Sequence, residues 1–273
     1  MSQNDPVLIQ AGIARALHVT RSFDVHQEIN RRVDFLANYL RVAPATSYVL
    51  GISGGVDSTT AGRLAQLAVE RLRAEGCDAK FIAVRLPHGI QADEVDAQLA
   101  LEFIKPDHIW AVDIEPATTA IINRLTFEDE DQEDFVRGNV KARQRMIAQY
   151  AIAGKESGLV IGTDHAAESV MGFFTKFGDG GADVLPLAGL TKRRVRAIAQ
   201  ELGAPNRLVF KTPTADLEEL RPQRPDENAF GVSYDAIDDF LEGMPVTEHD
   251  RKIIMKCYNA TRHKRDLPYT PFG

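Results

Sequence analysis

Apolar and polar residues alternate with two different periods along the first two thirds of the chain. Within residues 24–41, isoleucine, valine and leucine recur at helical spacing, at positions 29, 33, 36 and 40, with charged residues between them. This pattern predicts an amphipathic helix. The run 47–52, SYVLGI, is short and apolar and predicts a buried strand. By the same criteria we predict further helices at 57–73, 91–103 and 132–153 and further strands at 80–86, 108–114 and 159–162.

Strands that alternate with helices in this way are typical of an α/β fold, in which helices flank a parallel sheet. Beyond Gly189 the pattern predicts helices alone, at 191–202, 234–241 and 247–263, with a proline-rich, charged stretch at 207–228. The sequence shows no internal repeat and no linker long enough to separate domains. We therefore expect residues 1–273 to form one α/β domain with a helical C-terminal extension.

The composition narrows the class of protein. The chain has 273 residues, 44% of them hydrophobic and 26% charged, which is ordinary for a globular protein. Its net charge of −7 argues against a protein that mainly binds long nucleic acids. No apolar run reaches the roughly 18–20 residues needed to span a membrane, and the polar N-terminus does not resemble a signal peptide. Cys77 and Cys257 cannot form a disulfide framework or a four-ligand zinc site by themselves. We expect a cytoplasmic protein that binds neither membranes nor nucleic acids.

The most informative segment joins the first strand to the helix after it. Glycine in such a turn allows close approach to a ligand and positive φ, and the N-terminus of the next helix attracts anions. An aspartate here would repel a bare phosphate, so its presence suggests a bridging Mg²⁺. The segment is neither a Walker A loop nor a Gly-x-Gly-x-x-Gly turn. Its residues are Gly51, Ile52, Ser53, Gly54, Gly55, Val56, Asp57 and Ser58.

Ser-Gly-Gly-x-Asp-Ser after a first strand resembles the pyrophosphate loop of the N-type ATP pyrophosphatases, which have a Rossmann-like, adenine nucleotide alpha hydrolase-like fold. Further blocks follow in the order found in ammonia-dependent NAD⁺ synthetases, which this chain resembles from about residue 29 to residue 264. These blocks are GNVKAR at 138–143, IGTDHAAE at 161–168, GFFTKFGDGGAD at 172–183, TPTADL at 212–217 and HKR at 263–265.

The resemblance implies an ATP-dependent amidation. The nicotinate carboxylate of deamido-NAD⁺ attacks the α-phosphorus of ATP, which gives an acyl-adenylate and pyrophosphate, and ammonia then displaces AMP. The substrates implied are ATP, deamido-NAD⁺ and ammonia, and the cofactor is Mg²⁺. A homodimer is also implied, with the dinucleotide site near its interface.

The resemblance further implies roles for individual residues. Asp57 and Glu168 would bind Mg²⁺, and Asp57 and Lys192 would take part in catalysis with Asp179 as a base for ammonium. Beyond the glycine loop, the ATP contacts would be Arg85, Gln91, Thr163, Lys192 and Thr214. We interpret His165 as a residue at a helix N-terminus rather than as a metal ligand, because nothing nearby in the sequence completes a zinc set.

The deamido-NAD⁺ site has a partial signature in helical spacing. Phe135, Asn139 and Arg143 fall at i, i+4 and i+8 and form one row, beside a core-like row of Val136, Val140 and Ile147. An exposed row without a ligand is the alternative interpretation. By the resemblance, the remaining contacts to this substrate would be Lys176, Asp183, His263 and Lys264.

Three positions differ from the usual family pattern: Val56 replaces a common glutamine, His88 a frequent tyrosine, and Thr212 the second lysine of some relatives. Other members of the superfamily remain alternatives. A GMP synthetase subunit would lack the 138–143 and 172–183 blocks, and a tRNA-modifying enzyme would favour a basic surface. A non-catalytic nucleotide-binding module would not need both Asp57 and Glu168. A glutamine-dependent synthetase would need a second large domain, so we expect free ammonia as the nitrogen source unless a separate chain supplies it.

Overall fold

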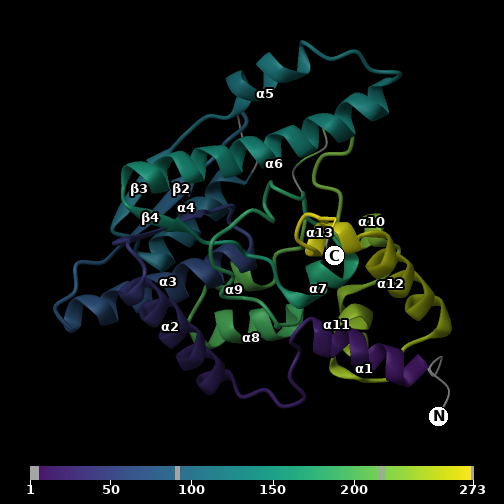
Figure 1. Ribbon diagram of the computed structural model, residues 1–273, viewed down its shortest axis with the longest axis horizontal. Coiled ribbons are helices and arrows are strands. Elements are labelled where there is room, and N and C mark those ends of the chain that lie inside the picture. Colours follow the sequence, from purple (N-terminus) through teal and green to yellow (C-terminus); the bar gives the residue numbers. More distant parts are fainter. Residues whose placement is uncertain (1–5, 90–92, 215–216, 218, 272–273) are drawn as a thin grey trace.

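The fold centres on a parallel sheet. Across residues 6–89, 93–214, 217 and 219–271, which the computed structural model describes, four strands pair in the order β3-β2-β1-β4 (Figure 1). The strands are β1 (Ser47–Gly51), β2 (Lys80–Arg85), β3 (His108–Ala111) and β4 (Gly158–Val160). In the register, Ser47 lies opposite both Lys80 and Gly158. All the pairings are parallel, as the alternation of strands and helices predicts.

Alternate strand residues point to opposite faces of the sheet, and helices bury both faces. Tyr48, Leu50 and Phe81 belong to the cluster formed with α2 (Val25–Val42), α3 (Val56–Ala74), α4 (Glu94–Ile104) and α8 (Lys192–Glu201). Val49 and Ile82 pack on the other side with the end of α6 (Glu130–Lys155). Figure 1 shows α5 (Glu115–Ile122) running beside α6. The predicted α/β class is confirmed.

A second hydrophobic cluster lies beside the sheet layer and contains the chain's N- and C-terminal helices, at the right of Figure 1. Ile13 of α1 (Pro6–Ala16) and Ile254 of α12 (Glu248–Ala260) meet side chains of α7 (Ala166–Met171) and α11 (Tyr234–Glu242) there. Shorter helices α9 (Asn206–Val209), α10 (Asp226–Phe230) and α13 (Arg262–Arg265) complete the described helices. The helical C-terminal extension is therefore confirmed, and α1 packs against it.

The observed elements differ from the predicted ones mainly where the sequence signal is short. The sequence analysis did not predict α1 or α5. β3 ends at Ala111, earlier than predicted, and β4 spans Gly158–Val160, with Ile161 forming an isolated bridge to Val184. None of the described helices is both long and apolar enough to cross a membrane.

Candidate active site

The loop between β1 and α3 is held in shape by its own serines. Ser58 Oγ accepts the N–H of Ser53 at 3.2 Å and lies 3.0 Å from Ser53 Oγ, which accepts the N–H of Gly55 at 3.2 Å. Gly55 is the N-cap of α3, and none of the described side chains caps this end of the helix. The first turn of α3 thus presents backbone N–H groups to an anion, as expected for a phosphate site.

Gly54 makes the tight turn of this loop possible. Its φ is +82°, a conformation that favours glycine, and a Cβ placed there would lie 2.6 Å from the backbone nitrogen of Ala97. The loop therefore packs directly against the backbone of α4. Arg85, at the end of β2, donates to the carbonyl of Ile52 and pairs with Glu94 at 2.8 Å, so the neighbouring strand also fixes the loop.

A cavity of about 310 Å³ opens beside the loop, at the carboxyl end of the sheet. This is the place where open parallel sheets bind ligands. Gln91 lies outside the described residues, and Gly54 supports the loop from behind without lining the cavity. The predicted site residues that line the cavity are Gly51, Ile52, Ser53, Gly55, Val56, Asp57, Ser58, Arg85, Thr163, Glu168, Asp179, Lys192 and Thr214.

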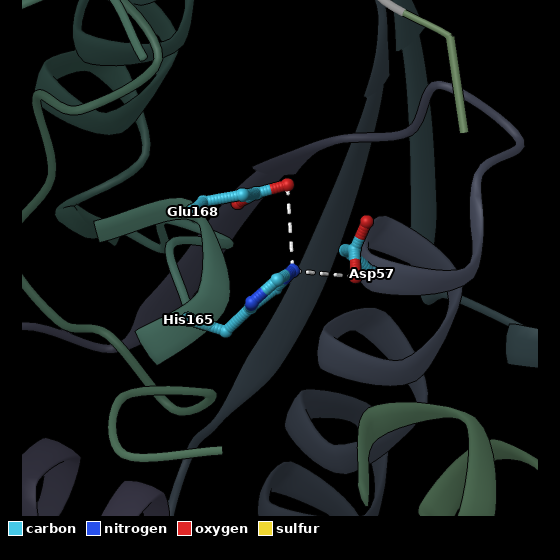
Figure 2. Close-up of side chains that lie close together, drawn as sticks. All are labelled: Asp57, His165 and Glu168. Atoms are coloured by element: carbon cyan, nitrogen blue, oxygen red, sulfur yellow. Dashed lines mark ion pairs between the residues drawn. The ribbon is translucent and has the colours of Figure 1, made fainter. Parts of the chain in front are cut away.

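Asp57, Glu168 and Lys192 line one wall of this cavity and converge on His165, which lies behind them. Figure 2 shows His165 between Asp57 and Glu168, with its Nε2 atom 3.4 Å from an oxygen of each carboxylate. Lys192 Nζ lies 2.7 Å from Asp57 Oδ2 and 3.8 Å from Glu168 Oε1. The side chains of His165 and Lys192 are 0% and 1% exposed. Two partly exposed carboxylates thus face two buried basic side chains.

The charged groups of this cluster shift one another's pKa values. Burial opposes ionisation of Asp57, but Lys192 and His165 outweigh it and hold the pKa of this carboxyl well below its usual range. Burial likewise disfavours the charged forms of His165 and Lys192. The carboxylates of Glu168 and Asp57 nevertheless raise the pKa of His165 to about 9, and Asp57 and Glu168 also raise the pKa of Lys192. Asp57, His165 and Lys192 therefore carry charge at neutral pH.

The cluster also fits a divalent cation. Asp57, His165 and Glu168 each offer a ligand atom within 4.8 Å of the others, and Asp57 Oδ1 is buried without a hydrogen-bond partner among the described residues. Two carboxylates suit a hard cation such as Mg²⁺. This set is not apparent in the sequence, because Asp57 approaches His165 from a distant part of the chain. A metal-bound histidine usually donates its other N–H, but His165 Nδ1 has no described partner, so we keep the interpretation of His165 as a non-ligand.

Three further carboxyls line the cavity: Asp93, Asp179 and Asp226. Asp179 accepts the N–H of Thr175 at 2.9 Å, and burial raises its pKa to about 6. Asp226 accepts the hydroxyl of Tyr234 at 3.1 Å, and burial raises its pKa to about 6 as well. Such values lie much closer to neutral pH than an ordinary carboxyl does, which suits proton transfer.

The residues predicted for the second substrate do not line this cavity, but several of them contact the 172–183 segment, whose Phe173 and Asp179 do line it. Asn139 Oδ1 accepts the hydroxyl of Thr175 at 3.0 Å, and Arg143 donates to the carbonyl of Lys176 at 3.4 Å. Lys176 donates to the carbonyl of His263, and Lys264 donates to the carbonyls of Gly172 and Phe174. Asp183 accepts the Val160 N–H at 2.7 Å, and Phe135 is 63% exposed at the end of the row. These contacts bring Asn139, Arg143, Lys176, His263 and Lys264 together, but most of the contacts are made to backbone carbonyls.

One prediction about α6 is wrong, and several cavity residues were missed. Ile147, placed in a core-like row, is 52% exposed, because it continues the i, i+4 row of Phe135, Asn139 and Arg143. Ala142, Arg145 and Gln149 of α6 line the cavity, and their i, i+3 and i+7 spacing was a usable signal. Gln149 accepts the Gly51 N–H at 2.7 Å. Lys211 and Asp226 also line the cavity, but the proline-rich, charged stretch in which they lie shows no such periodicity.

Comparisons with known proteins agree with this geometry. The NAD synthase family model matches residues 28–268. An NH(3)-dependent NAD(+) synthetase of Paraburkholderia phytofirmans is 65% identical over 277 residues, which cover 100% of this chain and 97% of that protein.

Two solved structures are also similar. A crystal structure of NAD+ synthetase from Burkholderia pseudomallei superposes with a TM-score of 0.85 at 60% identity, covering 98% of this chain and 100% of that one. A structure of NMN synthetase from Francisella tularensis has a TM-score of 0.80 at 34% identity, covering 92% of this chain and 99% of that one.

Proposed function

The chain belongs to the NAD synthase family, and we propose that it amidates deamido-NAD⁺ with free ammonia, with cleavage of ATP to AMP and pyrophosphate. The product is NAD⁺, and the enzyme is a ligase that forms a carbon–nitrogen bond. The observation that supports this function most directly is the convergence of Asp57, Glu168 and Lys192 on a cavity beside an anion-binding loop.

The chemistry requires activation of a carboxylate, because its negative charge repels nucleophiles and oxide is a very poor leaving group. In the first step a carboxylate oxygen forms a bond to the α-phosphorus, and the bond from that phosphorus to pyrophosphate breaks. In the second step the ammonia nitrogen bonds to the acyl carbon, AMP leaves with its oxygen, and the nitrogen loses a proton. Both steps need positioning and charge neutralisation rather than an enzyme nucleophile.

The cavity residues supply these functions. We propose that the backbone N–H groups of the loop and the ammonium group of Lys192 bind the phosphate oxygens, while Asp57 and Glu168 hold Mg²⁺ on them. When bound, Mg²⁺ neutralises the charge that develops on the departing pyrophosphate. Arg85, Gln91, Thr163 and Thr214 would complete the ATP contacts.

Asp179 is the proposed base for the second step. Its carboxyl lines the cavity, and burial raises its pKa to about 6, so it is a stronger base than an exposed aspartate and is still ionised at neutral pH. Deamido-NAD⁺ would then bind between this cavity and the cluster around residues 172–183. Its proposed contacts are Phe135, Asn139, Arg143, Lys176, Asp183, His263 and Lys264.

One assay tests the function. The purified chain is incubated with ATP, Mg²⁺ and deamido-NAD⁺, with either ammonium or glutamine, and AMP and NAD⁺ are quantified. We expect equimolar AMP and NAD⁺ with ammonium and background levels with glutamine. Parallel reactions replace deamido-NAD⁺ with nicotinate mononucleotide, xanthosine monophosphate or tRNA. Preferred turnover of any of these, or no NAD⁺ with ammonium, would overturn the proposal.

We also propose that the enzyme is a homodimer that pairs through α5, α6 and the edge strand β3. Large apolar side chains are exposed on these elements and on the segment between α5 and α6, which is typical of interaction surfaces. The row of Asn139 and Arg143 lies on the same helix, so pairing there would place the dinucleotide near the interface. The exposed apolar residues are Ile109, Ile121, Leu125, Phe135, Ile147 and Tyr150.

The location and the domain organisation are proposals as well. Cys77 and Cys257 are both free thiols, which agrees with a reducing compartment, and we propose the cytoplasm. We propose that residues 1–273 act as one domain, because α8 packs its Val195 into the sheet cluster and binds α11 through Lys192 and Arg193.

A further inference from the structure

Helix α8 begins without a cap of its own. Its N-cap residue, Thr191, forms no side-chain cap with the described part of the helix, and its hydroxyl donates instead to Glu242 at 2.7 Å. The first N–H groups of a helix have no partner within the helix and need one from outside. At α8 the first such groups belong to Lys192 and Arg193. The acceptor that binds these N–H groups therefore fixes the position of the Lys192 backbone.

Asp238 of α11 supplies the missing acceptor. Its Oδ1 atom accepts the N–H of Lys192 at 3.0 Å, and its Oδ2 atom accepts the N–H of Arg193 at 2.7 Å. Asp238 is 1% exposed, so this carboxyl binds the start of α8 out of contact with water. A residue distant in the sequence thus acts as the helix cap that the local sequence lacks.

The same face of α11 also supports the other end of the lysine. Tyr234 precedes Asp238 by four residues and therefore lies on the same side of the helix. The ammonium nitrogen of Lys192 lies 4.9 Å from the centroid of the Tyr234 ring, within cation–π range. Lys192 is therefore held by α11 at its backbone nitrogen and at its ammonium group, and the ammonium reaches Asp57 at 2.7 Å.

We propose that Asp238 is a positioning residue for Lys192, which sets the ammonium group of Lys192 against the ATP phosphates through the first turn of α8. Asp238 does not line the cavity, so it acts only through the element that it caps. Misplacing a catalytic group by about 1 Å can cost about 100-fold in rate. The inference rests on the proposed ATP contact of Lys192.

The test is a double-mutant cycle on ATP affinity, measured by calorimetry so that inactive variants can be compared. Four proteins are used: wild type, Asp238→Asn, Lys192→Met and the double variant. Asn has one acceptor oxygen, so it can satisfy only one of the two N–H groups, and it keeps the size of the side chain. We expect Asp238→Asn to weaken ATP binding by about 10-fold in the wild-type background and by less than about 2-fold beside Lys192→Met. In steady-state assays we expect Asp238→Asn to lower kcat/KM for ATP and to leave the KM for deamido-NAD⁺ unchanged.

A matched control separates positioning from stability. Asp107 accepts the N–H of Phe81 at 2.8 Å at the start of β2, the opposite end of the sheet from the cavity. Asp107→Asn should lower the melting temperature without changing ATP affinity. The proposal is wrong if Asp238→Asn lowers the melting temperature without changing ATP affinity, as expected of Asp107→Asn. It is also wrong if Asp238→Asn weakens ATP binding equally in the wild-type and Lys192→Met backgrounds. Unchanged ATP affinity in Lys192→Met would instead refute the proposed role of Lys192.

Discussion

Lys192 Nζ lies 2.7 Å from Asp57 Oδ2, although Lys192 begins α8 and Asp57 lies in the first turn of α3. The pair joins the first turn of α3 to α8, the second helix after β4. Because Lys192 is buried, the ammonium group depends on its carboxylate partners to remain charged. Asp57 is also a proposed Mg²⁺ ligand. The same carboxylate would therefore both keep Lys192 charged and hold the metal ion.

Asp57→Asn should nearly abolish turnover while the protein still folds. The change removes one of the two proposed Mg²⁺ ligands and leaves Lys192 and His165 with Glu168 as their remaining carboxylate partner. We expect kcat/KM for ATP to fall by roughly 10³-fold, the scale of losing a group that stabilises the transition state. Pyrophosphate release measures the activity, paramagnetic resonance of Mn²⁺ measures cation binding, and circular dichroism checks the fold. Retention of most activity or of Mn²⁺ affinity would refute the metal role.

Gly54→Ala should weaken ATP binding far more than a matched glycine substitution does. At Gly54 a Cβ would meet the backbone of α4 at 2.6 Å, so the loop must move, whereas Gly76 has a similar φ of +85° and nothing within 4 Å. Both variants experience the strain of a left-handed residue, about 1–2 kcal/mol. We expect Gly54→Ala alone to reduce ATP affinity, by at least about 10-fold. Equal ATP affinities for the two variants would show that the contact with α4 does not shape the loop.

The sequence was sufficient to predict the sheet and the position of the glycine loop between β1 and α3, because both depend on local signals. The strand SYVLGI is apolar throughout, and the glycines and Asp57 follow it directly. α5 was missed because its eight residues, EPATTAII, are too few to show a period, although a proline near its start is typical of a helix N-terminus. α1 was missed for a similar reason, since its apolar face is narrow and only Gln10 and Ile13 are buried.

The arrangement around His165 could not be predicted from spacing. Its neighbour Glu168 lies three residues away in α7, but Asp57 and Lys192 arrive from α3 and α8 through tertiary packing. The capping role of Asp238 was even less predictable from the sequence. The pattern of α11 predicts a helix but does not indicate that one of its carboxyls caps another helix. Such contacts depend on how elements pack, which hydrophobic periodicity does not specify.

Ile147→Glu should convert the proposed dimer into monomers. Ile147 is 52% exposed on α6, in the same i, i+4 row as Arg143. A charge buried in an apolar interface without a partner is strongly unfavourable, so we expect the dissociation constant of the dimer to rise by at least about 10²-fold. Light scattering after size exclusion measures the mass, and Val42→Glu, at an 80% exposed site on α2, is the control. A wild-type protein that is monomeric at assay concentration, or an Ile147→Glu dimer, would contradict this interface.

The metal-free protein should lose stability as the pH rises from about 7 to 9.5, and His165 should be a main cause. The pKa of His165 is raised from 6.5 to about 9 in the folded protein, because Glu168 and Asp57 outweigh the effect of burial. A raised histidine pKa stabilises the fold fully below about 6.5, and this contribution disappears as the pH passes 9. Asp179, Asp226 and Asp238, each with a pKa raised by burial to about 6, have already ionised below this window.

The measurement is the Tm against pH in EDTA, without nucleotide. Each retained unit of the pKa shift corresponds to about 1.4 kcal/mol, and 1 kcal/mol moves the Tm of a chain of this size by roughly 2–4 °C. The wild-type Tm should therefore fall by several degrees across the window, and His165→Gln should flatten the profile. His249→Gln, at an exposed histidine, should leave it unchanged. Parallel profiles for wild type and His165→Gln would mean that the imidazole is already neutral at pH 7, and the two carboxylates would then have Lys192 as their only counter-charge among the four clustered groups.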